Sequence, residues 1–149
     1  QPQVDIISGK ILGFEALARM KSEDLGHVSP MEFIPIAEEK LLIVELGTFV
    51  LKKSCEFIKT LNQHNIFNQW VAINISAAQI LRSDFVKTIL GIIEECDCDK
   101  NQIELEITES LLIDNFELVN NQLDRLRRFR IKISLDDFGT GYSSFFFFF

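Results

Sequence analysis

The sequence predicts an α/β fold, a (β/α) barrel in which parallel strands alternate with helices. One observation behind this prediction is that strand-like runs, each with an aliphatic and a polar face, alternate with helical patterns. Another is that four of these runs carry an acid or amide oxygen toward their ends: Glu15, Asn74, Glu106 and Asp136. A barrel gathers the carboxyl ends of its strands at one mouth, where this fold places its active sites.

The competing architecture is an open α/β sheet. Strands of such a sheet lie between two layers of helices and read as aliphatic on both faces. Here the second face of the strands is polar, which favours a barrel with a polar interior. A complete eight-fold barrel needs about 250 residues, so the 149 residues are expected to form an incomplete one.

The chain opens with a predicted hairpin. Residues 2–7 and 10–20 have strand patterns and are joined by the turn-like pair Ser8-Gly9, so one strand is expected to run antiparallel to the others. Within the longer run, period-two alternation separates Phe14, Ala16 and Ala18 from three side chains on the opposite face: Glu15, Leu17 and Arg19.

Helical patterns fill the intervals between the strands. Ser29-Pro30-Met31-Glu32 combines an N-cap, a proline at the first helical position and a capping-box glutamate. Apolar residues at helical spacing predict a long amphipathic helix over residues 43–65. Ser83-Asp84 is expected to cap a third helix, and Asp114 or Asn115 a fourth.

Three further strands have the same two-faced pattern. Their expected inward sets are Ala72, Asn74 and Ser76, then Glu104, Glu106 and Thr108, then Lys132, Ser134 and Asp136. Asp136 and Asp137 precede a Phe-Gly-Thr-Gly segment whose glycines permit tight turns. Adjacent carboxylates repel each other unless a cation or a hydrogen-bond network holds them. This strand end is therefore a candidate cation site, with a helix cap as the plainer interpretation.

Composition limits the function classes. The net charge is −7, from 15 basic and 22 acidic residues, which argues against a general binder of DNA or RNA. No transmembrane run or signal peptide is recognisable, so no membrane contact is expected within this segment. Cys55, Cys96 and Cys98 are few and odd in number, which fits a reducing cytosol, and they are interpreted as ordinary helix-end thiols. The five phenylalanines of residues 145–149 form a tail with no assigned function.

Six motifs follow one another in a recognisable order. They are Gln1-Pro2-x-Val4-Asp5, Gly13-Phe14-Glu15-Ala16-Leu17-x-Arg19, Ser29-Pro30-x-x-Phe33-Ile34-Pro35-x-Ala37-Glu38, Asn74-x-Ser76, Glu106-x-Thr108-Glu109 and the segment 136–144. This series resembles the EAL domain of bacterial cyclic di-GMP phosphodiesterases, whose namesake triplet is Glu15-Ala16-Leu17. Residues 1–144 are accordingly identified as the N-terminal part of such a domain.

The resemblance implies a TIM-type barrel that hydrolyses cyclic di-GMP to linear pGpG with Mg²⁺ or Mn²⁺ in a two-metal site. It implies catalytic roles for Glu15, Asp136 and Asp137. The implied ligands of one metal are Glu15, Asn74, Glu106 and Asp136, with Asp137 serving a second. The implied substrate contacts are Leu17, Arg19, which would bind a phosphate, and Gln1, which would approach a guanine base. Glu109 would pin the loop after Asp137. Hard divalent cations prefer oxygen ligands of this kind.

The family's catalytic lysine and its later glutamates have no counterpart in the chain, so this segment alone is expected to be inactive. One function class is a phosphodiesterase represented by its N-terminal part, and the other is a catalytically inactive EAL-type module that binds cyclic di-GMP or a protein partner. A different divalent-metal barrel enzyme is a third. The resemblance implies a bacterial cytoplasmic location. A homodimer, and sensor or cyclase domains in the parent protein, remain open.

Overall fold

The computed structural model describes residues 1–136, apart from the side chains of residues 112–114. Asp137, the glycine-rich segment after it and the five terminal phenylalanines lie outside the described residues, and so does the expected domain boundary at residue 144. Among the described residues, no helix is both long enough and apolar enough to cross a bilayer.

Five strands form the main sheet, in the order β1-β2-β5-β6-β7. They are β1 (Pro2–Val4), β2 (Ile11–Ala16), β5 (Trp70–Asn74), β6 (Ile103–Thr108) and β7 (Lys132–Asp136). β1 runs antiparallel to β2, and every other pair is parallel. Within the described residues the sheet does not close on itself. The predicted α/β fold with one antiparallel strand in an incomplete barrel is thus confirmed.

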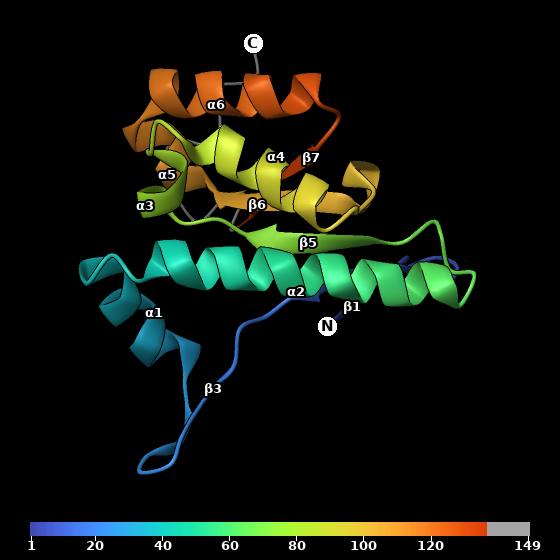
Figure 1. The fold of residues 1–149 in the computed structure, drawn as a ribbon, viewed down its shortest axis with the longest axis horizontal. Helices are drawn as coiled ribbons and strands as arrows, with labels where there is room; N and C mark the ends of the chain where they lie inside the picture. The colour runs from blue at the N-terminus through green and yellow to red at the C-terminus, as the bar shows by residue number, and fades with distance from the viewer. Residues whose placement is uncertain (137–149) are drawn as a thin grey trace.

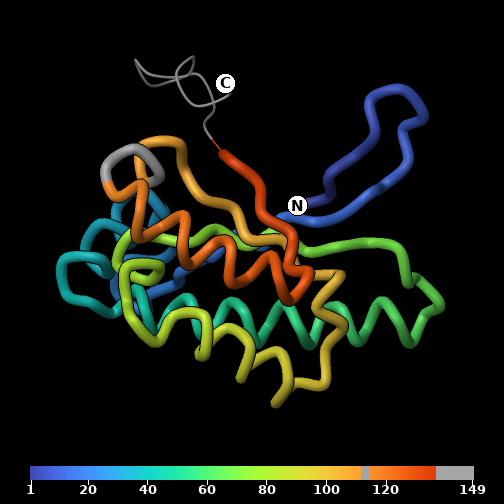
Figure 2. The backbone as a smooth tube through the Cα atoms, turned by 90° about the horizontal axis from the view of Figure 1, so that it is seen from above, coloured from blue at the N-terminus to red at the C-terminus, as the bar shows by residue number. Residues whose placement is uncertain are grey.

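Three long helices cover one face of this sheet (Figures 1 and 2). They are α2 (Ile43–Gln63), α4 (Phe85–Glu95) and α6 (Phe116–Arg128), and α4 packs against both of the others. The core between helices and strands is aliphatic, with Ile73, Leu105 and Ile107 of the sheet at 1% exposure. The central strands β5 and β6 therefore bury their aliphatic faces under helices, and this burial leaves their polar faces on the opposite side.

The helix boundaries follow the sequence signals closely. The Ser29 hydroxyl accepts a hydrogen bond from the Met31 backbone nitrogen at 3.3 Å and begins α1 (Pro30–Glu39). The predicted long helix over residues 43–65 is confirmed as α2. Asp84 and Asn115 occupy the N-cap positions of α4 and α6 without a side-chain capping bond. For Asp84 the reason is that its carboxylate pairs with Arg82, at 2.9 and 3.0 Å.

Several short elements were not predicted. The chain leaves the sheet after Ala16 and forms a small hairpin, β3 (Met20–Ser22) with β4 (Gly26–Val28), that projects from the domain (Figure 1). The prediction of a strand that continues to residue 20 was wrong for this reason. Two short helices, α3 (Ala77–Ile80) and α5 (Glu109–Asp114), and a 3₁₀ turn (Lys100–Gln102) follow or precede strands directly.

Candidate functional site

The polar face of the sheet carries the four strand-end residues singled out in the sequence. Parallel pairing matches Glu15 with Ala72, Asn74 with Glu106, and Thr108 with Asp136. Paired residues share a face, and so do residues two apart on one strand. Glu15, Asn74, Glu106 and Asp136 therefore lie on one face, near the carboxyl ends of four neighbouring strands.

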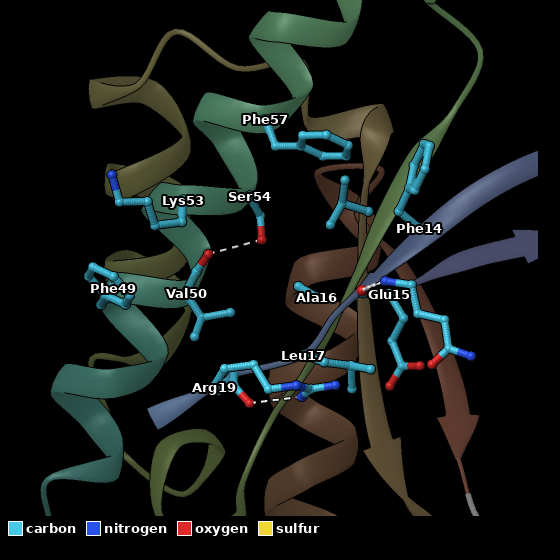
Figure 3. Close-up of a pocket in the computed structure, with 13 residues that line it drawn as sticks. Phe14, Glu15, Ala16, Leu17, Arg19, Phe49, Val50, Lys53, Ser54 and Phe57 are labelled. Atoms are coloured by element: carbon cyan, nitrogen blue, oxygen red, sulfur yellow. Dashed lines mark hydrogen bonds between the residues drawn. The ribbon is translucent and has the colours of Figure 1, made fainter. Parts of the chain in front are cut away.

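The close-up in Figure 3 shows how β2 divides its side chains. Phe14 turns toward Phe57 of α2, and their rings meet edge to face with centroids 5.1 Å apart. The Glu15 carboxylate points away from α2, toward the polar face. Hydrophobic packing of Phe14 thus fixes the direction of its neighbour, because successive strand residues point to opposite sides.

Hydrogen bonds connect these side chains across the strands. The Asn74 side-chain nitrogen donates to Glu15 Oε1 at 3.1 Å. The Gln3 side-chain nitrogen approaches Glu106 Oε1 at 3.5 Å. These contacts leave each carboxylate with further lone pairs, so the acids retain capacity to accept from another partner.

Glu106 is the most strongly perturbed acid of the site. Burial of its carboxyl group, followed by the charges of Glu15, Asp136 and Glu104, raises its pKa to about 7, while the hydrogen bond from Gln3 acts in the opposite direction. Like charges and lost hydration both penalise the ionised form. The hydrogen bond from Gln3 therefore does not offset the burial and the negative charge that surround Glu106.

The donor set fits a hard divalent cation in type and charge. It offers carboxylate and amide oxygens and neither sulfur nor imidazole, which is the preference of Mg²⁺ and Mn²⁺. A carboxyl group with a raised pKa holds a proton where a cation would otherwise balance the charge. Within residues 1–136, however, no three Cys, His, Asp or Glu side chains stand close enough to form a ready cage. Asp137, the implied ligand of a second metal, lies outside the described residues.

Leu17 and Arg19 lie just beyond the end of β2. Both line a hollow of about 230 Å³ that also reaches Asn74. The Arg19 guanidinium donates to the Ala18 carbonyl oxygen at 2.9 Å (Figure 3). Gln1 lines an adjoining groove of about 300 Å³, which Leu17 and Arg19 also border together with Glu15. The backbone nitrogen of Gln1 donates to the Glu15 carbonyl oxygen at 2.7 Å. The structure thus brings Gln1, Leu17 and Arg19 together beside Glu15, and Leu17 and Arg19 also lie beside Asn74.

Glu109 is the first residue of α5 and is buried, at 7% exposure, directly after the end of β6. Next to it the hydroxyl groups of Thr108 and Ser110 are hydrogen-bonded at 3.3 Å. A hollow of about 360 Å³ opens here and is bordered by Asn74, Glu106 and Thr108. The loop that Glu109 is expected to pin lies outside the described residues.

Two side chains on this face, Gln3 and Trp70, were not predicted from the sequence, and Lys132 was predicted only to face inward. Trp70 of β5 contacts Gln3 of β1 and Lys132 of β7. Gln3 in turn contacts Glu106. Trp70 is the chain's one tryptophan, and that rarity was the signal available. Strand alternation alone does not reveal these contacts, because they depend on which strands become neighbours.

Residues 1–149 match the EAL domain family, and the chain belongs to it. The cyclic di-GMP phosphodiesterase PA2567 of Pseudomonas aeruginosa is 39% identical over 144 residues, which cover 97% of this chain and 24% of that protein. The signaling protein YkoW of Bacillus subtilis is 35% identical, over 97% of this chain and 18% of its own length.

Solved structures show the same similarity. The PaMucR phosphodiesterase in complex with c-di-GMP superposes with a TM-score of 0.92 at 32% identity, over 97% of this chain and 58% of that one. The EAL enzyme Bd1971, with cAMP and cyclic di-GMP bound, gives a TM-score of 0.88 at 32% identity. The match covers 97% of this chain and 40% of that one. The chain therefore spans about half of these structures and about a quarter or less of the two curated relatives.

Proposed function

We propose that this chain is the N-terminal part of a phosphodiesterase domain that hydrolyses cyclic di-GMP to linear pGpG with Mg²⁺ or Mn²⁺. The observation that carries the proposal is the meeting of acids from neighbouring strand ends around Glu106. Burial of this carboxyl group and then the charges of Glu15 and Asp136 raise its pKa to about 7. A carboxyl group perturbed by burial together with like charges is typical of functional sites. The named phosphodiesterase relatives and the c-di-GMP complexes support the substrate class.

In the proposed site Glu15, Asn74, Glu106 and Asp136 hold a metal through oxygen atoms, and Asp137 serves a second. The metal, when bound, polarises the phosphate and lowers the pKa of a bound water. The Asn74 amide holds the Glu15 carboxylate by its 3.1 Å hydrogen bond and so limits the rotation of that ligand. Arg19, next to this pair, supplies a planar fork of donors for a phosphate oxygen.

The second candidate is a catalytically inactive module that binds the dinucleotide or a protein partner. The absence of a preformed acid cage within residues 1–136 favours it. The two candidates differ in product formation, because binding requires the donors around Leu17 and Arg19, whereas hydrolysis also requires the metal ligands.

The test is chromatography of nucleotide products, made with the full-length protein that carries this chain and with Mn²⁺ or Mg²⁺. We expect pGpG from the wild type and a loss of at least about 1,000-fold in Glu15→Ala, because a metal ligand is removed. Glu45→Ala, on the exposed side of α2, is the matched control and should retain the wild-type rate. A folded, metal-loaded wild type that binds cyclic di-GMP and makes no pGpG would establish the binding module instead.

A further inference from the structure

Gln3, Gly13 and Trp70 are neighbours across three strands of the sheet. Gln3 of β1 is paired with Gly13 of β2, and Gly13 is paired with Trp70 of β5. The pairing of β1 shifts register between Gln3 and Val4. Irregularities of this kind re-aim a strand side chain and are common beside active sites. The Gln3 side chain accordingly reaches along the polar face toward the strand ends.

Contacts from two other strands hold Trp70 in position. A Cβ atom at Gly13 would stand 2.7 Å from Trp70 Cε2, so only a glycine lets the indole lie this close to β2. From β7, Lys132 Nζ lies 4.2 Å from the ring centroid, within the range of a cation–π interaction. The indole is therefore a rigid group at the base of the polar face.

The rigid indole fixes the orientation of the Gln3 amide. Trp70 Nε1 donates to Gln3 Oε1 at 3.1 Å, and an indole nitrogen can only donate. The amide oxygen of Gln3 must therefore face Trp70. Its nitrogen then faces the other way, where Glu106 Oε1 lies 3.5 Å distant. An inverted amide would lose the indole bond and turn an oxygen toward a carboxylate.

From this chain of contacts we infer that Gln3 is a positioning residue for Glu106, and that Trp70 acts on Glu106 through Gln3. The inference rests on the proposed function, in which Glu106 is a metal ligand. Gln3 does not touch the metal. It donates a hydrogen bond to one carboxylate oxygen and so leaves the other oxygen, in a defined direction, for the cation. The contact is long, so its contribution is mainly orientation.

The effect is measurable as Mn²⁺ affinity, which does not depend on turnover. Electron paramagnetic resonance of free Mn²⁺ gives the dissociation constant for the full-length protein, with Glu106→Gln as the blank that identifies binding at other sites. We expect Gln3→Leu, which keeps the side-chain size and removes the amide, to weaken binding about 10-fold, as supporting hydrogen bonds to metal ligands commonly do. Gln63→Leu, at the exposed end of α2, is the matched control with unchanged affinity.

Two further variants test whether the indole acts through Gln3. They are Trp70→Phe and the double variant that combines Gln3→Leu with Trp70→Phe. We expect Trp70→Phe to weaken Mn²⁺ binding by several-fold, and the double variant to bind as weakly as Gln3→Leu alone. A merely structural loss would instead add in the double variant and would lower the melting temperature in parallel. Circular dichroism monitors that melting, and Trp70→Phe carries the test by itself if Gln3→Leu does not fold.

The outcomes separate the two proposals. Wild-type affinity in a folded Gln3→Leu variant, or additive losses in the double variant, would overturn the positioning role and leave the proposed function standing. A wild type that binds no more Mn²⁺ than the Glu106→Gln blank would refute the metal site, and the positioning role with it.

Discussion

Glu106 illustrates how a single side chain responds to its neighbours across the sheet. Its strand has an ordinary alternating pattern, and Glu104 on the same face has the same chemistry. What distinguishes Glu106 is partial burial together with the approach of Glu15 and Asp136 from the strands β2 and β7. Its pKa of about 7 lies well above the ordinary value of 4.5, so the carboxyl group is largely protonated in mildly acidic solution.

This shift predicts a pH dependence of stability in the metal-free protein. The folded state binds the proton more tightly than the unfolded state, so the stabilisation is complete below about pH 4.5 and is lost as the pH rises through about 7. We expect the difference in unfolding free energy between wild type and Glu106→Gln to change by about 1 kcal/mol over this interval, after allowance for solvent screening of a half-buried group. Urea denaturation at several pH values measures it, and parallel pH curves for the two proteins would contradict it.

The same shift predicts how metal binding depends on pH. A cation competes with the proton on Glu106, so Mn²⁺ affinity should increase as the pH rises from about 5.5 to about 7.5. Glu106→Gln should bind weakly at every pH in this range. Calorimetric titration with Mn²⁺ at each pH is the measurement. An affinity that stays constant between these limits would show that Glu106 does not bind the metal.

At the scale of single elements, two glycines have opposite surroundings. Gly13 in β2 lies against the Trp70 ring, whereas an added Cβ at Gly91 in α4 would meet nothing within 4 Å. Overpacking a fixed aromatic ring is destabilising. Glycine within an exposed helix is less favourable than alanine, because the unfolded glycine has more conformational freedom.

These surroundings predict that alanine at the two positions changes the unfolding free energy in opposite directions. Gly13→Ala should lower the unfolding free energy by about 1–3 kcal/mol, because the Cβ displaces Trp70. Gly91→Ala should raise it by about 0.5–1 kcal/mol. Chemical denaturation followed by circular dichroism compares the two variants. Equal effects would mean that Trp70 is free to move away from β2.

The junction of α2 and α4 brings together the chain's three cysteines, for which the sequence predicts ordinary helix-end thiols. Cys55 is fully buried, and Cys96 and Cys98 pack against the same core. A hydrogen bond with Cys55 lowers the pKa of Cys98, and the charge of Lys59 contributes in the same direction. The same bond, together with burial, raises the pKa of the Cys55 thiol. The chain reversal at Asp97, with a φ of 47°, precedes Cys98 directly.

The unequal thiols predict selective alkylation. Iodoacetamide should modify Cys98 before Cys55 at neutral pH, because the thiolate is the reactive form and Cys55 is buried. Cys55→Ala should slow the modification of Cys98 several-fold by removing its hydrogen-bond donor. Peptide mapping by mass spectrometry over time gives both rates. Faster labelling of Cys55 in the folded protein would contradict the arrangement.

At the scale of the whole molecule, the described residues form an open sheet with two exposed edges. β1 and β7 each have a single neighbour, and the polar face that carries the candidate site is not enclosed by further strands. Unpaired edges invite association with other chains. The chain covers 58% and 40% of two similar solved chains, and we expect the remaining catalytic groups to lie outside residues 1–149 of the full-length protein.

This arrangement predicts the behaviour of the 149-residue chain expressed alone. It should form no measurable pGpG, because losing one group that activates the attacking water can cost several orders of magnitude. It should also associate through its free edges. Product chromatography against the full-length protein and light scattering after purification measure both properties. Turnover near the full-length rate would show that the essential groups all lie within residues 1–149.

Features that depend on residues close together along the chain could be predicted from the sequence. Alternation identified which side of β5 and β6 is aliphatic, and Ser29 with Pro30 defined the start of α1. Ordered motifs identified the EAL family. These signals are local, since the backbone geometry of a strand or helix converts residue spacing directly into a face. They also selected Glu15, Asn74, Glu106 and Asp136 as strand-end residues, whose metal-binding roles stay predictions.

The relations between strands, in contrast, became visible only in the folded chain. The order β1-β2-β5 brings Gln3, Gly13 and Trp70 together, although about 70 residues separate the first from the last along the chain. The raised pKa of Glu106 and the meeting of Cys55 with Cys98 likewise require groups that are distant in sequence. β2 ends at Ala16, where the chain turns away to form β3 and β4, although the alternating pattern continues. Register, burial and strand order are non-local properties, so residue spacing within one strand does not encode them.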